Sequence, residues 1–354
     1  MIAVLALLVS LSSSAIAYEA EFLCAHVTLA EDSEAVKVRQ FAPSRRVDVH
    51  HLKLDVTPDF RNRTVEGEAA VTFAPIAKPL KTLRLDQVDL NVHEVTSDRD
   101  IQGYDLTEDA LLITFTEPVP AEETAAITVR YDAEPKQGLY FRTRELGYAV
   151  GDEHVWTQGE THEARHWYPS YDYPNERFTS EVICHVPEAM TVLSNGIEVS
   201  NEVSADGVRT SHWKQQKPHV NYLVALVAGP MKRVTGMYKD IPLGLYTQPS
   251  DIGEARHTFA GLDSMMAFFE EEIGVPYPWD QCNQVTIYDP HFGGMENTTL
   301  STLNVGTLHR PELTENLRPS RGLVAHELAH QWFGDYVTCK DWSHIWLNEG
   351  FATY

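Results

Sequence analysis

The chain has 354 residues, of which 43% are hydrophobic, so it can bury a large core and is longer than one average domain. It contains 51 acidic and 28 basic residues, and its formal net charge at pH 7 is −23. This negative charge argues against nucleic acid and against an anionic membrane surface as partners. We therefore expect two domains, and we expect particular motifs rather than overall charge to indicate the function.

The first 17 residues are typical of a signal for export. An apolar run from Ile2 to Leu11 is followed by three serines and by Ala15-Ile16-Ala17, which fits an A-x-A cleavage pattern. The run is too short to span a bilayer, and no other transmembrane segment is expected. A secreted or periplasmic location follows. Because the start amine is the only positive charge before the run, a misassigned start or a buried strand is the alternative.

Residues 18–43 are expected to be an irregular polar lead segment, and residues 44–236 are predicted to form a β-rich domain. Short segments in this part alternate apolar and polar residues or are rich in β-branched residues, and Pro and Gly separate them. The expected strands are Val47–Val56, Val65–Phe73, Leu111–Phe115, Ala126–Tyr131 and Val182–Val186. The domain is expected to end soon after the apolar run at 222–229.

Residues 237–354 combine helix and strand patterns. Apolar residues at 259, 262, 266 and 269 have helical spacing, which predicts a helix over residues 255–272. A strand is expected at 284–288, and it leads into Gly293. The segment 293–297 should therefore lie in a loop or at a sheet edge, where an extended peptide could add as a further strand.

The most informative pattern is H-E-x-x-H at His326, Glu327 and His330. The two histidines are four residues apart, so on a helix both imidazoles lie on one face at a separation that suits one metal ion. In this pattern the histidines bind zinc and the glutamate acts as general base. Apolar residues surround the pair, and Gly334 is expected to end the helix. Glu349, in a second helix-like segment, adds a third ligand and leaves a fourth position for water, which predicts one catalytic Zn²⁺ ion.

A second motif, Gly293-Gly294-Met295-Glu296-Asn297, lies upstream of the zinc pattern and is similar to the G-x-M-E-N exopeptidase signature. Together the two motifs make the chain resemble the M1 (gluzincin) family of zinc aminopeptidases, from about residue 44 to the end. Gly294 stands where many members have Ala. The segment Thr157-Gln158-Gly159-Glu160 is similar to the substrate-contacting segment of the family's first domain.

The resemblance implies a multidomain fold. An N-terminal all-β domain of saddle-like antiparallel sheets is followed, over 237–354, by an α+β, thermolysin-like zinc metallopeptidase domain that is incomplete at its C-terminus. Tyr354 lies only five residues after Glu349, whereas the family places a tyrosine that stabilises the oxyanion well downstream. We expect these residues alone to bind zinc poorly and to be nearly inactive, and the full-length gene product to be an aminopeptidase.

The resemblance also implies the role of each site residue. Glu327 takes the proton of a zinc-activated water, while Glu296, with Gln158 and Glu160, holds the free α-ammonium group of a peptide substrate. Gly293, Gly294, Met295 and Asn297 belong to the same substrate-binding segment. Acylation of the amino terminus would leave the carboxylates unpaired, so the expected substrates are peptides with a free N-terminus.

Other functions and the state of the cysteines remain open at this stage. One branch of the family adds epoxide hydrolysis in the same pocket, and a non-catalytic peptide-binding homologue is a further alternative. A thermolysin-like endopeptidase shares the zinc residues, but the 293–297 motif argues against it. Cys24, Cys184, Cys282 and Cys339 form no C-x-x-C pair, so disulfides and free thiols are both compatible with the sequence. The sequence predicts neither residue specificity nor oligomeric state.

Overall fold

The structure, a computed structural model, describes residues 42–310 and 317–354. The predicted export signal, nearly all of the lead segment and Cys24 lie outside the described residues. Cys184, Cys282 and Cys339 are buried free thiols. Within the described ranges, no helix combines the length and the apolar character needed to cross a membrane.

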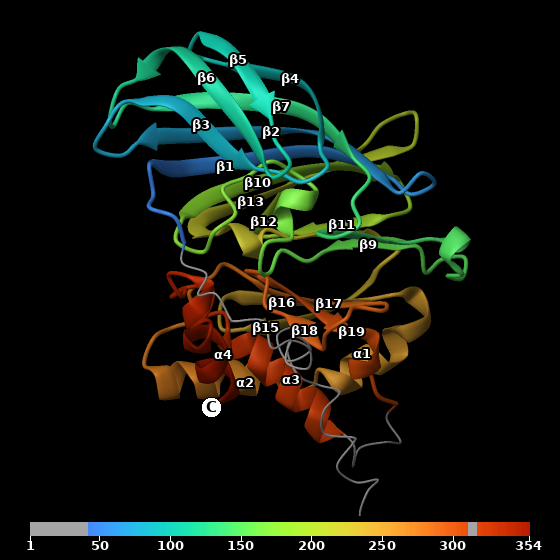
Figure 1. The fold of residues 1–354 in the computed structure, drawn as a ribbon. Coiled ribbons are helices and arrows are strands. Elements are labelled where there is room, and N and C mark those ends of the chain that lie inside the picture. The colour runs from blue at the N-terminus through green and yellow to red at the C-terminus, as the bar shows by residue number, and fades with distance from the viewer. Residues whose placement is uncertain (1–41, 311–316) are drawn as a thin grey trace, which may run out of the picture.

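A seven-stranded sheet dominates the first part of the chain (Figure 1). Its strands are antiparallel except for one parallel pair, β1 with β10. In sheet order they are β12 (Ile197–Val203), β13 (Val208–Val220), β10 (Arg177–Pro187), β1 (Val47–Asp59), β2 (Thr64–Pro75), β7 (Ala125–Ala133) and β4 (Asn91–Ser97). The alternation seen in the sequence has a physical cause, because every second residue over much of β1 and β2 is buried.

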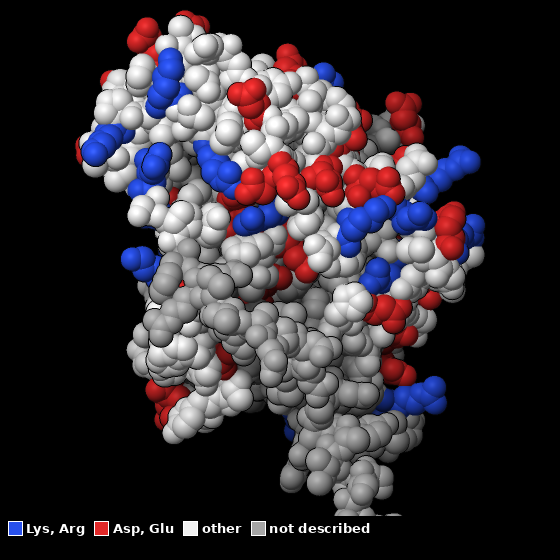
Figure 2. Space-filling model, viewed as in Figure 1, with Lys and Arg blue, Asp and Glu red and all other residues white. Residues whose placement is uncertain are grey.

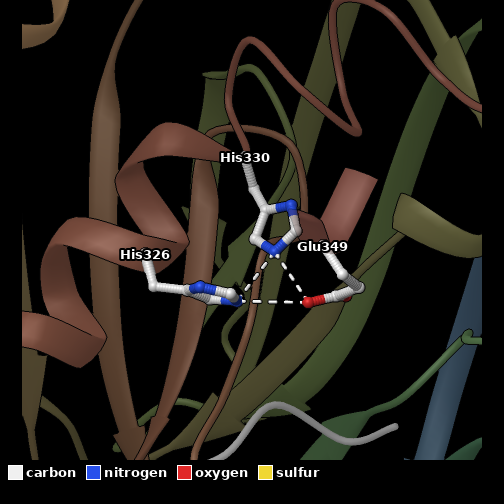
Figure 3. A group of neighbouring side chains, drawn as sticks. All are labelled: His326, His330 and Glu349. Atoms are coloured by element: carbon white, nitrogen blue, oxygen red, sulfur yellow. Dashed lines mark hydrogen bonds and ion pairs between the residues drawn. The ribbon is translucent and has the colours of Figure 1, made fainter. Parts of the chain in front are cut away.

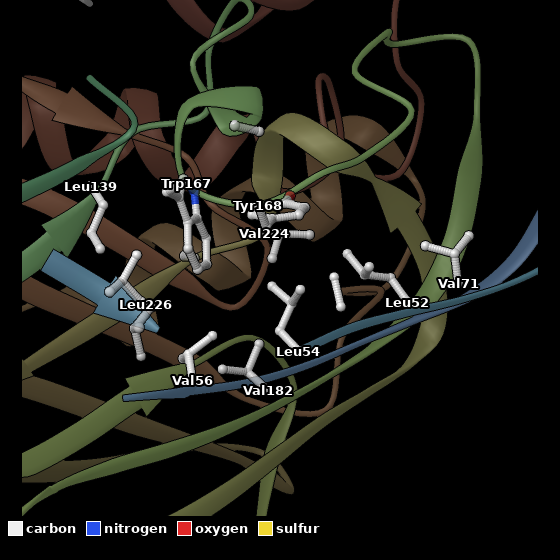
Figure 4. Packing of buried hydrophobic residues seen from close by; sticks show 14 of the residues in the cluster. Leu52, Leu54, Val56, Val71, Leu139, Trp167, Tyr168, Val182, Val224 and Leu226 are labelled. Atoms are coloured by element: carbon white, nitrogen blue, oxygen red, sulfur yellow. The ribbon is translucent and has the colours of Figure 1, made fainter. Parts of the chain in front are cut away.

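Two smaller sheets complete this β-rich part. One consists of β3 (Leu80–Asp86), β6 (Ala110–Val119) and β5 (Ile101–Leu106), and the other of β11 (Thr191–Ser194), β14 (Leu226–Gly229), β9 (His154–Thr157) and β8 (Leu139–Arg142). Between the sheets lies one hydrophobic core. Leu54 and Val182 are register partners in it, and Trp167, Tyr168 and Leu226 belong to the same core (Figure 4).

The second part of the chain contains a mixed five-stranded sheet with helices packed beside it (Figure 1). In order, its strands are β15 (Lys232–Tyr238), β16 (Ile241–Thr247), β17 (Cys282–Ile287), β19 (Leu300–Asn304) and β18 (Gly294–Met295). The helices are α1 (Ile252–Thr258), α2 (Leu262–Ile273), α3 (Leu317–Ala329) and α4 (Trp346–Thr353). The boundary predicted at residue 236 falls inside β15. The predicted class, an all-β part followed by an α+β part, is confirmed.

One predicted helix is wrong in its extent. Residues 255–272 form two helices, since α1 ends at Thr258 and α2 begins at Leu262. Gly261 separates them with a φ of 95°, a left-handed conformation that interrupts a right-handed helix and that glycine adopts without steric cost. The buried residues still follow the predicted spacing, because Leu262 and Met266 both face the core of the second part.

Charge is distributed unevenly over the surface. Figure 2 shows acidic side chains in a row across the middle of the viewed face, with basic side chains beside it. Some charged side chains of the protein form ion pairs, as in the contacts of Arg84 with Asp86 and Asp109. Such ion pairs neutralise negative charges locally. The net charge of the chain therefore indicates no particular partner.

Candidate metal centre

Three predicted ligands meet between the end of α3 and α4 (Figure 3). His326 lies in the last turn of α3, and His330 follows the helix directly, with its backbone N–H still bonded to the His326 carbonyl at 3.1 Å. Glu349 lies in α4. Stacked rings of Phe333 and Phe351, 4.9 Å apart, connect the two segments. The helix ends before Gly334, the stop expected from the sequence, but the helical spacing of the two histidines is retained.

The distances between the three side chains suit a single small cation. The Nε2 atoms of His326 and His330 lie 3.0 Å apart, and Oε2 of Glu349 lies 3.3 and 3.5 Å from them. Ligands placed about 2.0–2.1 Å from a tetrahedral zinc ion would be separated by about 3.3 Å. The three atoms therefore fit one face of such a tetrahedron, and the chain supplies the two nitrogens and one carboxylate that zinc accepts.

Hydrogen bonding prepares His330 to act as a ligand. Its Nδ1–H donates to the carbonyl of Phe333 at 2.8 Å, which places the free lone pair on Nε2. Burial would raise the pKa of Glu349, but contacts with His326 and His330 outweigh burial and hold it below its ordinary value. The carboxylate is therefore ionised at neutral pH, which is the form that binds a cation.

Glu327 points toward the β18 edge of the sheet rather than toward solvent. It is fully buried, and among the described residues neither of its carboxylate oxygens has a hydrogen-bond partner. Its Oε1 lies so close to Gly294 that a Cβ atom there would be 2.2 Å away. Burial raises the pKa of Glu327 well above its ordinary value; His330 opposes this shift, while Glu296 and Glu349 increase it. A buried carboxylate without a donor needs a nearby cation or bound water.

The 293–297 motif lies at the terminal strand of the sheet, as predicted. β18 pairs with β19 through Gly294 and Met295, and the buried Glu296 follows directly. Glu296 Oε1 is 3.9 Å from Nδ1 of His330. Gly293 and Asn297 flank this segment, and both hold it in place: the Gly293 carbonyl accepts from the Asn304 amide, and the Asn297 carbonyl from the Leu300 amide, each at 2.8 Å.

The β-rich part contributes Gln158 and Glu160 to the same place. Gln158 Nε2 donates to the sulfur of Met295 at 3.2 Å. Carboxylate oxygens of Glu160, Glu296 and Glu349 lie within 4.8 Å of one another. The structure thus brings the predicted metal ligands, the predicted base and the predicted ammonium-binding residues together, although the role of each stays a prediction.

The sequence analysis missed one residue that connects these groups. Gln331 donates through Nε2 to the Glu296 carbonyl at 2.9 Å and accepts from the backbone N–H of Thr299 at 3.0 Å, so it fixes the loop after β18 to the end of α3. Its position directly after His330 was the available signal, because a buried amide beside a ligand needs partners of its own.

A β-rich domain is followed by a mixed domain that holds this site, and the comparisons with protein families assign both domains to family M1. The Peptidase M1 N-terminal domain matches residues 48–223, and the Peptidase family M1 domain matches residues 258–354. The chain belongs to this family.

The proteins that this chain is similar to include aminopeptidases from a fungus, a plant and a bacterium. The chain is 29% identical to Aminopeptidase 2 of Candida albicans over 92% of its own length and 36% of that protein. It is 28% identical to Aminopeptidase M1-D of Oryza sativa over 92% of its length and 38% of that protein, and 28% identical to Aminopeptidase N of Streptomyces lividans over 90% and 37%. The chain therefore spans little more than a third of the length of the curated relatives it matches.

Proposed function

We propose that the full-length protein is a zinc-dependent aminopeptidase. The observation that carries the proposal is the triangle of His326, His330 and Glu349 beside the three clustered carboxylates of Glu160, Glu296 and Glu349. A metal site next to clustered carboxylates suits a substrate that presents a carbonyl group to the metal and a cationic group to the carboxylates. The aminopeptidase names of the relatives support the same substrate class.

Zinc bound by these three residues would polarise a substrate carbonyl and lower the pKa of water, which supplies a nucleophile at neutral pH. In this proposal Glu327 is the general base. Its position one residue after His326 and its lack of a hydrogen-bond partner within the described residues leave its oxygens available to take a proton from the attacking water. It then returns the proton to the leaving amine, a contribution of about 10²- to 10⁴-fold in rate.

Peptide binding follows from the sheet edge and the carboxylates. An extended substrate can add to β18 as a further strand, so that its scissile carbonyl is held in register with the metal ligands. The carboxylates of Glu160 and Glu296 then accept the terminal ammonium group. Charge-assisted contacts of this kind contribute roughly 1.5–3 kcal/mol each, so an acetylated terminus loses much of the binding free energy.

The test compares an aminoacyl arylamide with its N-acetylated form, with and without a chelator, in the full-length protein. We expect hydrolysis of the free-amine substrate, loss of activity on chelation, recovery on addition of zinc, and little hydrolysis of the acetylated form. Equal rates on the two substrates would contradict the proposed exopeptidase, and activity unaffected by a chelator that removes all zinc would contradict the metal mechanism.

A further inference from the structure

The side chain of Tyr222 reaches from the β-rich part into the candidate site. It lies in a short 3-10 helix after β13 and is 1% exposed. Its hydroxyl is 3.3 Å from Oε1 of Glu296, 3.2 Å from Nδ2 of Asn348 and 3.4 Å from the carbonyl of Gly334. One phenolic oxygen therefore contacts the ammonium-binding carboxylate, the residue beside Glu349 and the turn that follows His330.

The single proton of this hydroxyl can be assigned. Asn348 Nδ2 can only donate, so the acceptor is either Glu296 Oε1 or the Gly334 carbonyl. The carboxylate oxygen is the nearer of the two, at 3.3 against 3.4 Å, and the carbonyl also accepts from Thr338 Oγ1 at 2.5 Å. We therefore assign the proton to the contact with Glu296. Its other carboxylate oxygen is buried and has no hydrogen-bond partner in the described part of the chain, so the Tyr222 proton fixes the direction of the carboxylate.

Two further contacts make the hydroxyl a rigid support. The Tyr222 ring packs edge-on against Trp342 with centroids 5.0 Å apart, so it has little freedom to rotate away. Its backbone carbonyl lies 2.1 Å from the position that a Cβ on Gly159 would take, which brings the Gln158–Glu160 segment against the same residue. The Asn348 amide is anchored in turn, because its Oδ1 accepts from the Cys339 N–H at 3.0 Å.

We propose that Tyr222 is a positioning residue for recognition of the substrate amino terminus, and that it acts through Glu296. This inference rests on the proposed aminopeptidase function. Tyr222 does not contact the reacting atoms in this account. It holds the carboxylate of Glu296 beside that of Glu160, where a terminal ammonium group can contact both.

The experiment measures the preference of the zinc-loaded, full-length protein for L-leucine hydroxamate over N-acetyl-L-leucine hydroxamate. The two probes share the hydroxamate group that binds the metal and differ only in the acetyl group on the amine. The ratio of their dissociation constants therefore measures the contribution of the free ammonium group to binding. Tyr222→Phe should keep stoichiometric zinc, since the hydroxyl contacts none of the three predicted ligands, and should reduce the ratio about tenfold, as expected for loss of one hydrogen bond to a charged group. An unchanged ratio would overturn the inference.

Tyr238→Phe is the matched control. The Tyr238 hydroxyl donates to Oε2 of Glu270 at 2.8 Å, a tyrosine–carboxylate hydrogen bond of the same kind. Tyr238 lies in β15, at the opposite edge of the sheet from β18. Both variants should lose some stability, but only Tyr222→Phe should change the ratio; an equal change in both would show a merely structural effect and overturn the inference. A wild-type protein without any preference would instead contradict the proposed function.

A double-mutant cycle provides a second measurement. In a Glu296→Ala background, Tyr222→Phe should have no further effect on the ratio, because the residue through which it acts is already missing. Additive effects of the two substitutions would overturn the inference. The cycle also identifies loss of folding, because a misfolded variant would lose zinc together with the preference.

Discussion

Replacing Gly294 by alanine should disturb the general base without touching the metal ligands. A Cβ atom at this position would lie 2.2 Å from Oε1 of Glu327, 2.5 Å from its Cδ and 2.8 Å from its Cγ. Cβ contacts under 3.0 Å are essentially never observed, so the whole carboxylate has to withdraw by nearly 1 Å. The side chain moves more easily than the backbone, because Gly294 is paired with Leu303 in the sheet.

A displacement of about 1 Å in a catalytic group can cost about 100-fold in rate, which is the upper limit for this substitution. The clashing atoms are the far end of a flexible side chain, and many members of the resembled family have Ala at this position, so Glu327 can recover most of its placement. We therefore expect Gly294→Ala to reduce kcat by only about tenfold in the full-length protein, with zinc stoichiometry unchanged. Hydrolysis of an aminoacyl arylamide, with the bound metal quantified in the same samples, measures both quantities.

Gly322→Ala is the matched control for this substitution. Gly322 lies in α3, the helix that carries Glu327, and no atom lies within 4 Å of the position its Cβ would take. This change should leave kcat unchanged and should stabilise the helix by about 0.5–1 kcal/mol. Wild-type turnover in Gly294→Ala would refute the reasoning, since it would mean that Glu327 acts from a position other than the one beside the glycine.

Three other substitutions or conditions test the site and the fold. His330→Ala should abolish stoichiometric zinc, measured by elemental analysis after dialysis, because it removes one of three protein ligands; full retention of zinc would argue against the ligand set. Glu327→Gln should retain zinc and lose about 10²- to 10⁴-fold in turnover, because an amide cannot accept the proton; near wild-type rates would place the base elsewhere. Acidification from pH 7 to pH 5 should lower the free energy of unfolding in part through His154, and His154→Gln should reduce that loss in urea titrations.

Local patterns in the sequence predicted much of the fold and the site. Strand β1 was recognisable because one of its faces is buried, which imposes a period of two on residues from Val47 to Val56. The metal ligands on α3 were recognisable because helical geometry fixes the separation of residues four apart. The break at Gly261 was not predicted, because apolar spacing continues across it and only the left-handed φ marks the interruption.

Contacts between distant parts of the chain could not be derived from such patterns. Tyr222 meets Glu296 across 74 positions and Asn348 across 126. In the sequence this tyrosine begins an apolar run, where an interior packing role is the ordinary interpretation. Gln331 likewise acts on a loop that lies more than 30 residues earlier. Such residues become visible only when the three-dimensional arrangement shows which buried polar atoms have to satisfy one another.

The acid sensitivity expected from His154 follows from its place between the two parts of the chain. Its Nδ1–H donates to the Asp152 carbonyl at 2.6 Å, and its Nε2 accepts from the backbone N–H of Tyr288 at 3.2 Å, so the neutral ring uses both nitrogens. Burial lowers the pKa of His154 to about 4, and Arg142 lowers it as well, while the Asp152 carbonyl and Asp289 oppose the shift.

Below an unfolded-state pKa of about 6.5, the unfolded chain binds a proton at this residue before the folded chain does, so stability falls as the pH drops from about 6.5 toward 4. For His154 alone the loss between pH 7 and pH 5 amounts to about 2 kcal/mol. The wild-type protein, titrated with urea over the same pH range, provides the reference slope. An identical slope in His154→Gln and wild type would show that His154 binds a proton as readily in the folded as in the unfolded protein. It would then refute the pKa shift and the hydrogen bond that Nε2 accepts from Tyr288.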